Sequence, residues 1–391
     1  MPLMRSPDMP SVMPEIDDRT RRTMEESDSR HAESTSLSFE AYRRRRYDEL
    51  NARVGVRKAV YLDMKYWIWL RDPDRSPFPA ETKALRAALM HGVETRRLFC
   101  PVSYSVFVEL MRIKSIELRL RQAELMDELS EGFAIRNGFD MAEIEFCEFF
   151  GRNFPALRAI PYRVESVWCP IGQMVVEKYP YHDDLPADVM ERGRKVMLDV
   201  MWEKKMVDYA ALEGMPEHPR DTAARVNAER QAYPRGQQSF SELFAAELNG
   251  ALDVMYPRIE EQLVSVAGIF GIRPTAQERA EAGAYRHVLI NLFREAVTRG
   301  LDAKAIPSLR VRSALHASIR MDDRRPFREN DLEDIAHSSV AVSYSDLFLT
   351  ERSFGELLNR SAVQGVIAPT KCQVLSNVGD ALAAIRKILP E

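Results

Sequence analysis

The sequence predicts an α/β fold, in which a parallel sheet flanked by helices is interrupted by a large, mainly α-helical insertion. Short β-prone runs alternate with amphipathic helices near both ends of the 391-residue chain, and this alternation is typical of parallel sheets. Between residues 115 and 301 strand-like segments are sparse. Hydrophobic residues make up 45% and charged residues 29% of the chain, which excludes a fully disordered or collagen-like protein.

The N-terminal part combines a polar arm with a basic helix. Residues 1–36 contain few large apolar side chains, so we expect a disordered arm, because such a composition buries too little surface to offset the entropy of ordering. A helix follows over residues 39–53, with Ser36 or Ser38 as its N-cap. It carries four consecutive arginines at 43–46, either as a solvated face or as a phosphate-contacting patch.

The first α/β unit begins with the apolar run 58–62, which predicts a buried strand that ends at Asp63. Leucines and a valine at a spacing of four predict a helix over residues 81–94. Residues 97–102 are expected to form a second strand, and a helix with one apolar face then starts at residue 103 or 105. Strand, helix, strand and helix therefore follow one another within about 55 residues, as in a parallel sheet.

Alternation returns near the C-terminus after the helical interval, in which residues 215–238 are expected to form a long exposed loop. Short strands are predicted at 346–350 and 365–368, and a closing amphipathic helix at 378–388. We therefore expect a disordered arm and a discontinuous α/β domain, with the helical insertion as a separate subdomain. Their ranges are 1–36 for the arm, 37–114 plus 302–391 for the α/β domain, and 115–301 for the insertion.

Several features bear on the compartment and on partners. The four cysteines are widely spaced and form no CxxC motif, which predicts reduced core thiols without a disulfide framework or zinc ribbon. No run of about 18 apolar residues exists, and no basic start precedes an apolar stretch, so we expect a cytoplasmic protein with no membrane partner. The net charge of −4 does not favour nucleic-acid binding overall, although it permits a local basic groove.

The candidate chemistry lies in carboxylates at the ends of α/β elements, since P-loop, GxGxxG, HExxH and GxSxG motifs are all missing. Asp63 ends the first strand, Glu109 lies on the helix after the second, Asp334 opens a later helix, and Asp346 flanks the last clear strand. Carboxyl ends of parallel strands meet in one crevice. Carboxylates gathered there repel one another unless a hard cation such as Mg²⁺ or Mn²⁺ lies between them.

Each of these residues also has a structural alternative. An Asp after a strand, such as Asp63, is commonly a turn or N-cap residue. Asp331 and Asp334 could both cap a helix, and capping is the better interpretation for Asp331. His337 lies one turn after Asp334, where it could bond a carboxylate near the site or serve as a satisfied structural histidine. The hypothesis therefore depends on the set of residues and not on any one of them.

Three segments of the chain resemble the PIN-like domain nucleases, which are metal-dependent RNases that include many toxin–antitoxin ribonucleases. The segment 60–67 is similar to the family's opening strand with its metal-binding Asp, and 101–110 to its strand followed by a Glu-bearing helix. Residues 330–351 resemble its Asp-bearing helix, strand and terminal Thr-with-acid segment. The resemblance covers residues 56–114 and 302–391, and it departs from the family at Glu351, where an Asp is often seen.

The resemblance implies a metal-dependent endoribonuclease that hydrolyses RNA phosphodiester bonds, and a toxin-like role is one expectation that follows from it. Two ions in such a site can activate a water and stabilise the leaving oxygen. The implied ligands of Mg²⁺ or Mn²⁺ are Asp63, Glu109, Asp334, Asp346 and Glu351. Because the site is acidic, cations must bind the polyanion. The candidate substrate-binding residues are Thr350, Arg324, Arg325 and Arg328, with a solvated loop as the alternative for the arginines.

Two other readings remain open. In the first, the chain is a non-catalytic scaffold, in which the helical insertion binds a protein partner and the PIN-like domain is degenerate. In the second, Asp63 is the nucleophile of a phosphatase. The sequence Asp63-Met-Lys65 argues against the phosphatase, because a haloacid-dehalogenase-like site has a second Asp two positions after the first. Trp67 and Trp69 could stack on a base, although core packing is the better interpretation.

Overall fold

The computed structural model describes residues 17–33, 37–136, 138–153, 167–175, 185–212, 222–232, 238–269, 306–322 and 325–389, together with residues 275, 277 and 295. The strands are β1 (Lys58–Leu62), β2 (Leu98–Phe99), β3 (Val102–Ser103), β4 (Phe133–Ile135), β5 (Trp168–Pro170), β6 (Leu347–Leu349) and β7 (Gln373–Leu375). The helices of the N-terminal half are α1 (Asp18–Glu33), α2 (Phe39–Val54), α3 (Met64–Arg71), α4 (Pro79–Glu94), α5 (Tyr104–Met111), α6 (Ile116–Ser130), α7 (Gly138–Asn153), α8 (Ile171–Val175) and α9 (Ala187–Glu203). Those of the C-terminal half are α10 (Met206–Ala210), α11 (Thr222–Ala232), α12 (Phe240–Ile269), α15 (Pro307–Arg320), α16 (Glu329–Tyr344), α17 (Arg352–Leu358), α18 (Ser361–Ile367) and α19 (Val378–Ile388).

The main sheet has four parallel strands in the order β2-β1-β6-β7, so the expectation of a parallel α/β sheet is confirmed. The register pairs Val60 with Leu347 and Leu62 with Leu349 at its centre. The chain passes from β1 to β2 on one side and from β6 to β7 on the other. The boundary between β1 and β6 is therefore the topological switch point, where open α/β sheets bind ligands at the carboxyl ends of the strands.

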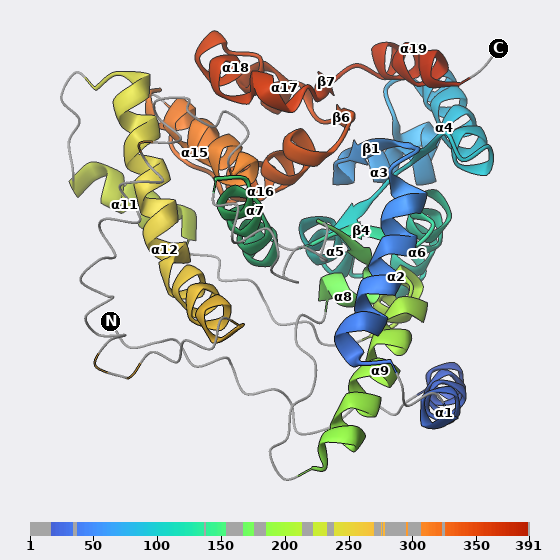
Figure 1. The fold of residues 1–391 in the computed structure, drawn as a ribbon. Coiled ribbons are helices and arrows are strands. Elements are labelled where there is room, and N and C mark those ends of the chain that lie inside the picture. The colour runs from blue at the N-terminus through green and yellow to red at the C-terminus, as the bar shows by residue number, and fades with distance from the viewer. Residues whose placement is uncertain are drawn as a thin grey trace.

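Helices from both ends of the chain cover this sheet. Helix α19 packs against α4 and β7, and α16 contacts β6 and α5, an arrangement that brings blue and red parts of the ribbon together (Figure 1). The amphipathic helix predicted over 378–388 is confirmed with the same bounds. Its buried face consists of Val378, Ala381, Leu382 and Ile385, spaced as one stripe of a 3.6-residue helix.

The helical interval does not form a separate subdomain, contrary to the sequence-based expectation. A second sheet pairs β3 in parallel with β4 and β4 antiparallel with β5, so it joins strands from both sides of the predicted boundary at residue 114. One contiguous apolar core contains Leu62 of β1, Met126 of α6 and Leu248 of α12. The apolar faces of α6 and α12 are buried against the α/β elements, and no boundary in the core separates them.

Several element predictions are corrected by the structure. Residues 97–102 form two short strands in different sheets, β2 and β3, because Pro101 lacks the N–H that a continuous ladder needs. Residues 365–368 belong to the end of α18 and the turn after it, and the strand of this region is β7. Part of the expected loop 215–238 is helix α11. All four cysteines are described and none is in a disulfide; Cys100 and Cys169 are buried as predicted, whereas Cys147 and Cys372 are partly buried.

The predicted disordered arm is wrong for the residues described in it, since α1 is a helix that packs on α9. Buried Asp199 of α9 accepts a hydrogen bond from Ser27 Oγ at 2.7 Å and lies 3.1 Å from His31 Nε2. Tyr42 of α2 donates to the same carboxylate at 2.5 Å. Polar contacts thus hold this helix, and the apolar composition on which the prediction relied does not detect them. Residues 1–16 lie outside the described residues.

In the described part of the chain, every helix is too short or too polar to cross a membrane.

Candidate metal centre

Asp63 lies where β1 ends and α3 begins, as its position after an apolar strand predicted. Its Oδ1 accepts the backbone N–H groups of Lys65 at 3.0 Å and Tyr66 at 3.3 Å, so Asp63 is the N-cap of α3. Its Oδ2 accepts the backbone N–H of Glu351 at 2.9 Å. Burial raises the pKa of Asp63 to about 6, against the opposing effects of the Thr350 hydroxyl and the nearby His337. The carboxylate therefore joins the carboxyl ends of β1 and β6 at the switch point.

Thr350 and Glu351 follow β6 at the same edge of the sheet. The Thr350 side chain is buried and hydrogen-bonds to Asp63, and its backbone N–H donates to Leu375 O at 2.9 Å. This hydroxyl therefore orients a carboxylate. Glu351 Oε2 lies 3.9 Å from Lys65 Nζ, so the Glu351 carboxylate is close to the start of α3 as well as to Asp63.

Asp334 projects from α16 toward these acids. Burial, together with the negative charges of Glu351, Asp63 and Glu109 and against the opposing effect of His337, raises the pKa of Asp334 to about 8. Its carboxyl group has no hydrogen-bond or ion-pair partner among the described residues. We call Asp63, Glu109, Asp334 and Glu351 the acidic group. Within the acidic group, Asp334 is the member whose charge is compensated least.

Glu109 is held by a chain of buried side chains. His337 Nε2 lies 3.2 Å from Glu109 Oε2, and His337 Nδ1 lies 2.7 Å from Tyr61 Oη. Tyr61 Oη is 2.6 Å from Ser103 Oγ, and Ser103 caps α5, the helix of Glu109. Burial alone would lower the pKa of His337, but the bond to Glu109 and the charges of Asp63 and Asp334 outweigh it, so the pKa is raised. His337 therefore bonds a carboxylate, one of its two predicted roles.

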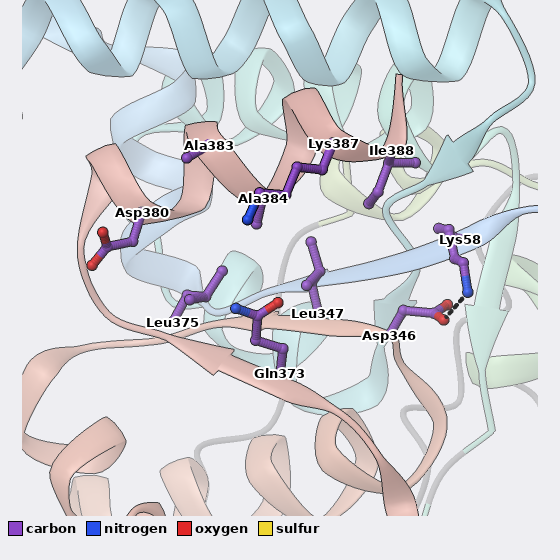
Figure 2. Close-up of a pocket in the computed structure, with 10 residues that line it drawn as sticks. All are labelled: Lys58, Asp346, Leu347, Gln373, Leu375, Asp380, Ala383, Ala384, Lys387 and Ile388. Carbon is purple, nitrogen blue, oxygen red and sulfur yellow. Dashed lines mark hydrogen bonds and ion pairs between the residues drawn. The ribbon is translucent and has the colours of Figure 1, made fainter. Parts of the chain in front are cut away.

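Asp346 does not join the acidic group, so its predicted role as a ligand there is wrong. It precedes β6, and its Oδ1 accepts from Lys58 Nζ at 2.7 Å while Oδ2 accepts from Ala59 N at 2.9 Å. Because β1 and β6 are parallel, this is the opposite end of the sheet, roughly 13 Å from Thr350 at ~3.3 Å per residue. Asp346 and Lys58 instead line a cavity of about 410 Å³ between the sheet and α19 (Figure 2).

Of the predicted substrate arginines, the two that are described, Arg325 and Arg328, lie at the start of α16. Asp331 accepts the backbone N–H of Arg328 at 2.9 Å and Arg325 Nη2 at 2.6 Å, so Asp331 caps α16 and engages Arg325. Arg328 is exposed at the start of α16, and Arg324 lies outside the described residues. Trp67 is fully buried in the core.

The structure adds residues that sequence reasoning missed. Tyr61 and Ser103 were not singled out, because each is an ordinary core-facing residue until the fold brings it to His337. Lys65 was also missed: its ammonium lies 4.7 Å from the centre of the partly buried Trp69 ring and beside Glu351. The available signal was its position two residues after Asp63, on the first turn of the helix that Asp63 caps.

The carboxylates of the acidic group shift one another's pKa, but their oxygens do not surround a single point. Among the described residues, no three His, Cys, Asp or Glu side chains are grouped closely enough to hold a metal ion together. Comparison with known proteins found no matching family model, no matching curated protein and no matching solved structure. The unpartnered Asp334 carboxyl and the oxygen-only donor set fit a hard divalent cation.

Proposed function

We propose that this protein is a metal-dependent nuclease with a PIN-like fold, which hydrolyses phosphodiester bonds of RNA. The observation that carries the proposal is the Asp334 carboxyl, which faces three other carboxylates without a partner of its own. Its position beside the topological switch point supports a ligand site there. All four members of the acidic group come from the three segments that resemble PIN-like nucleases. Asp346 also belongs to the third segment, but it lies at the other end of the sheet.

In this proposal Asp334 would ligate Mg²⁺ or Mn²⁺, and Asp63, Glu109 and Glu351 would attract the ion through their negative charges. A bound ion would supply an activated water and stabilise charge on the leaving oxygen. Asp63 is fixed by three backbone N–H groups, so it sets the relative positions of α3 and of Glu351. The Thr350 hydroxyl keeps Asp63 in that orientation.

His337 would act as a positioning residue. Both of its ring nitrogens are engaged, one by Glu109 and the other by Tyr61, so the imidazole cannot rotate without losing a buried hydrogen bond. A cationic His337 also offsets part of the repulsion between carboxylates. Through this contact the Glu109 carboxylate is held on the side of α5 that faces α16.

Cleavage of a single-stranded RNA with a fluorophore and a quencher at its ends tests the proposal. The full chain with Mn²⁺ should release fluorescence and the same chain in EDTA should not. Asp334→Asn should reduce the rate at least about 100-fold, or ~2.7 kcal/mol in activation free energy. Asp346→Asn is the matched control, because Asp346 lies at the opposite end of the sheet, and it should retain wild-type activity. No Mn²⁺-dependent cleavage, or equal rates for the two variants, would overturn the proposal.

One observation favours a second candidate, a non-catalytic protein that binds a partner through its helical part. His337 already bonds Glu109, and the described acids do not converge on one point. In that case the buried network would serve only to join α5, α16 and β1. The wild type would then show no cleavage with any divalent ion, and Asp334→Asn would change stability alone.

A further inference from the structure

An acidic site can accept a polyanion only if cations stand close to it. The sequence suggested arginines for binding the phosphates. Of those described, Arg325 is engaged by Asp331 and Arg328 is exposed at the start of α16. Two other cations are candidates: Lys65 contacts Glu351 of the acidic group, and Arg112 contacts Glu333, the neighbour of Asp334 in the sequence. Lys65 is two residues after Asp63, and Arg112 is three residues after Glu109.

Lys65 stands at the edge where α3 and α17 begin. Its side chain is 39% exposed, and its ammonium lies 3.9 Å from Glu351 Oε2. An ion pair of this length between half-exposed groups contributes little to stability, so a phosphate can replace the glutamate at small cost. The Trp69 ring lies 4.7 Å from the ammonium and restricts where Lys65 can point. Trp69 therefore supports Lys65, and its face is not open to stack on a base.

Arg112 lies between helices α5 and α16. It caps the C-terminus of α5, and its guanidinium contacts Glu333, the residue before Asp334 on α16. The Arg112 side chain is 46% exposed, so this pair is also partly solvated. A guanidinium offers a planar fork of donors that matches two phosphate oxygens. Lys65 and Arg112 thus contact different acids, Glu351 at the N-cap of α17 and Glu333 on α16.

We infer that Lys65 and Arg112 bind two phosphates of a single-stranded RNA on either side of the bond that the acidic group would cleave. The inference rests on the proposed function for the position of that bond, but it concerns binding and not hydrolysis. The two cations exchange their glutamate partners for phosphates when the strand arrives. Neutralising two phosphates in this way makes binding depend on salt, because bound counterions are released from the strand.

Anisotropy of a fluorescein-labelled 12-nucleotide RNA tests the inference with the full chain. The titrations are done in EDTA, so that no cleavage occurs, at several KCl concentrations. Lys65→Gln and Arg112→Gln should each weaken binding several-fold at low salt. Each should also reduce the slope of log Kd against log [KCl] by about 0.7, the value for one phosphate contact on a single strand. Lys58→Gln is the matched control: Lys58 is an exposed lysine at the opposite end of β1, paired with Asp346, and its variant should match the wild type.

An unchanged slope in the Lys65 and Arg112 variants, an equal change in the Lys58 variant, or no binding by the wild type would overturn the inference. Melting curves of all three variants show whether each is folded. Cleavage by the wild type in Mn²⁺ combined with an unchanged slope overturns the inference alone. A reduced slope without any cleavage overturns the proposed hydrolysis and leaves the two cations as an RNA-binding site.

Discussion

Binding of Mn²⁺ at the acidic group should release a proton from Asp334. The pKa of this carboxyl is raised to about 8, so at pH 7 it is about 90% protonated and must ionise before it can ligate a cation. Binding should therefore release about 0.9 proton at pH 7 and about 0.1 at pH 9. The apparent affinity should rise about tenfold from pH 6 to 7, about fivefold from pH 7 to 8, and little above pH 9.

Calorimetric titration of Mn²⁺ into the protein measures this release directly. The observed heat, compared between buffers of different ionisation enthalpy, gives the number of protons released at each pH. Asp334→Asn should bind Mn²⁺ too weakly at pH 7 to give a measurable proton release, because a neutral amide replaces the carboxylate that ligates the ion. The reasoning is refuted if the wild type binds Mn²⁺ with the same proton release at pH 7 and pH 9, or if Asp334→Asn releases as many protons as the wild type.

Three further predictions concern stability in the absence of a divalent ion. Because the pKa of Asp334 is raised in the folded protein, its ionisation destabilises the fold as pH rises from about 4 to about 8; Asp334→Asn should therefore raise the unfolding free energy at pH 8 by about 2 kcal/mol and change nothing at pH 3.5, as measured by urea unfolding at both values. Asp63→Asn should raise the unfolding free energy at pH 8 less than Asp334→Asn does, because relief of a buried charge whose pKa is raised to about 6 is offset by the loss of an acceptor for three backbone N–H groups, and an equal gain in the two variants would contradict that role. Asp199→Ala should release α1 by leaving Ser27 and His31 buried without their acceptor; trypsin should then cleave within α1 faster than in the wild type, and equal cleavage rates would contradict the role of Asp199.

The elements of the sheet could be predicted because short β-prone segments and amphipathic helical segments alternate in the sequence. The resemblance to PIN-like nucleases placed Glu351 in one site with Asp63, and the two residues meet across 288 positions of chain, at the edge where the carboxyl-end rule expects acids. The same rule failed for Asp346 because it requires knowing which end of a strand a residue occupies. A three-residue strand such as β6 places one flanking acid at each end of the sheet, and only the acid after the strand lies at the site.

The contacts that hold the site could not be predicted from periodicity. The chain of hydrogen bonds from Glu109 through His337 and Tyr61 to Ser103 joins α5, α16 and β1, and its members show no shared spacing in the sequence. The order of helix α1 escaped prediction for a similar reason, since it depends on a single buried carboxylate of α9. Apolar spacing identifies faces that bury hydrocarbon, and it carries no information on which polar groups will meet.

The central claim is that a divalent cation binds beside Asp334 at the carboxyl ends of β1 and β6. Crystals soaked in Mn²⁺ test it most directly, through an anomalous difference map collected near the manganese absorption edge. The account predicts a peak within ligand distance of an Asp334 oxygen, ~2.0–2.3 Å for a hard cation on carboxylates, and its loss in crystals of Asp334→Asn. A map without a peak at the acidic group, in crystals that remain ordered in millimolar Mn²⁺, would contradict the claim.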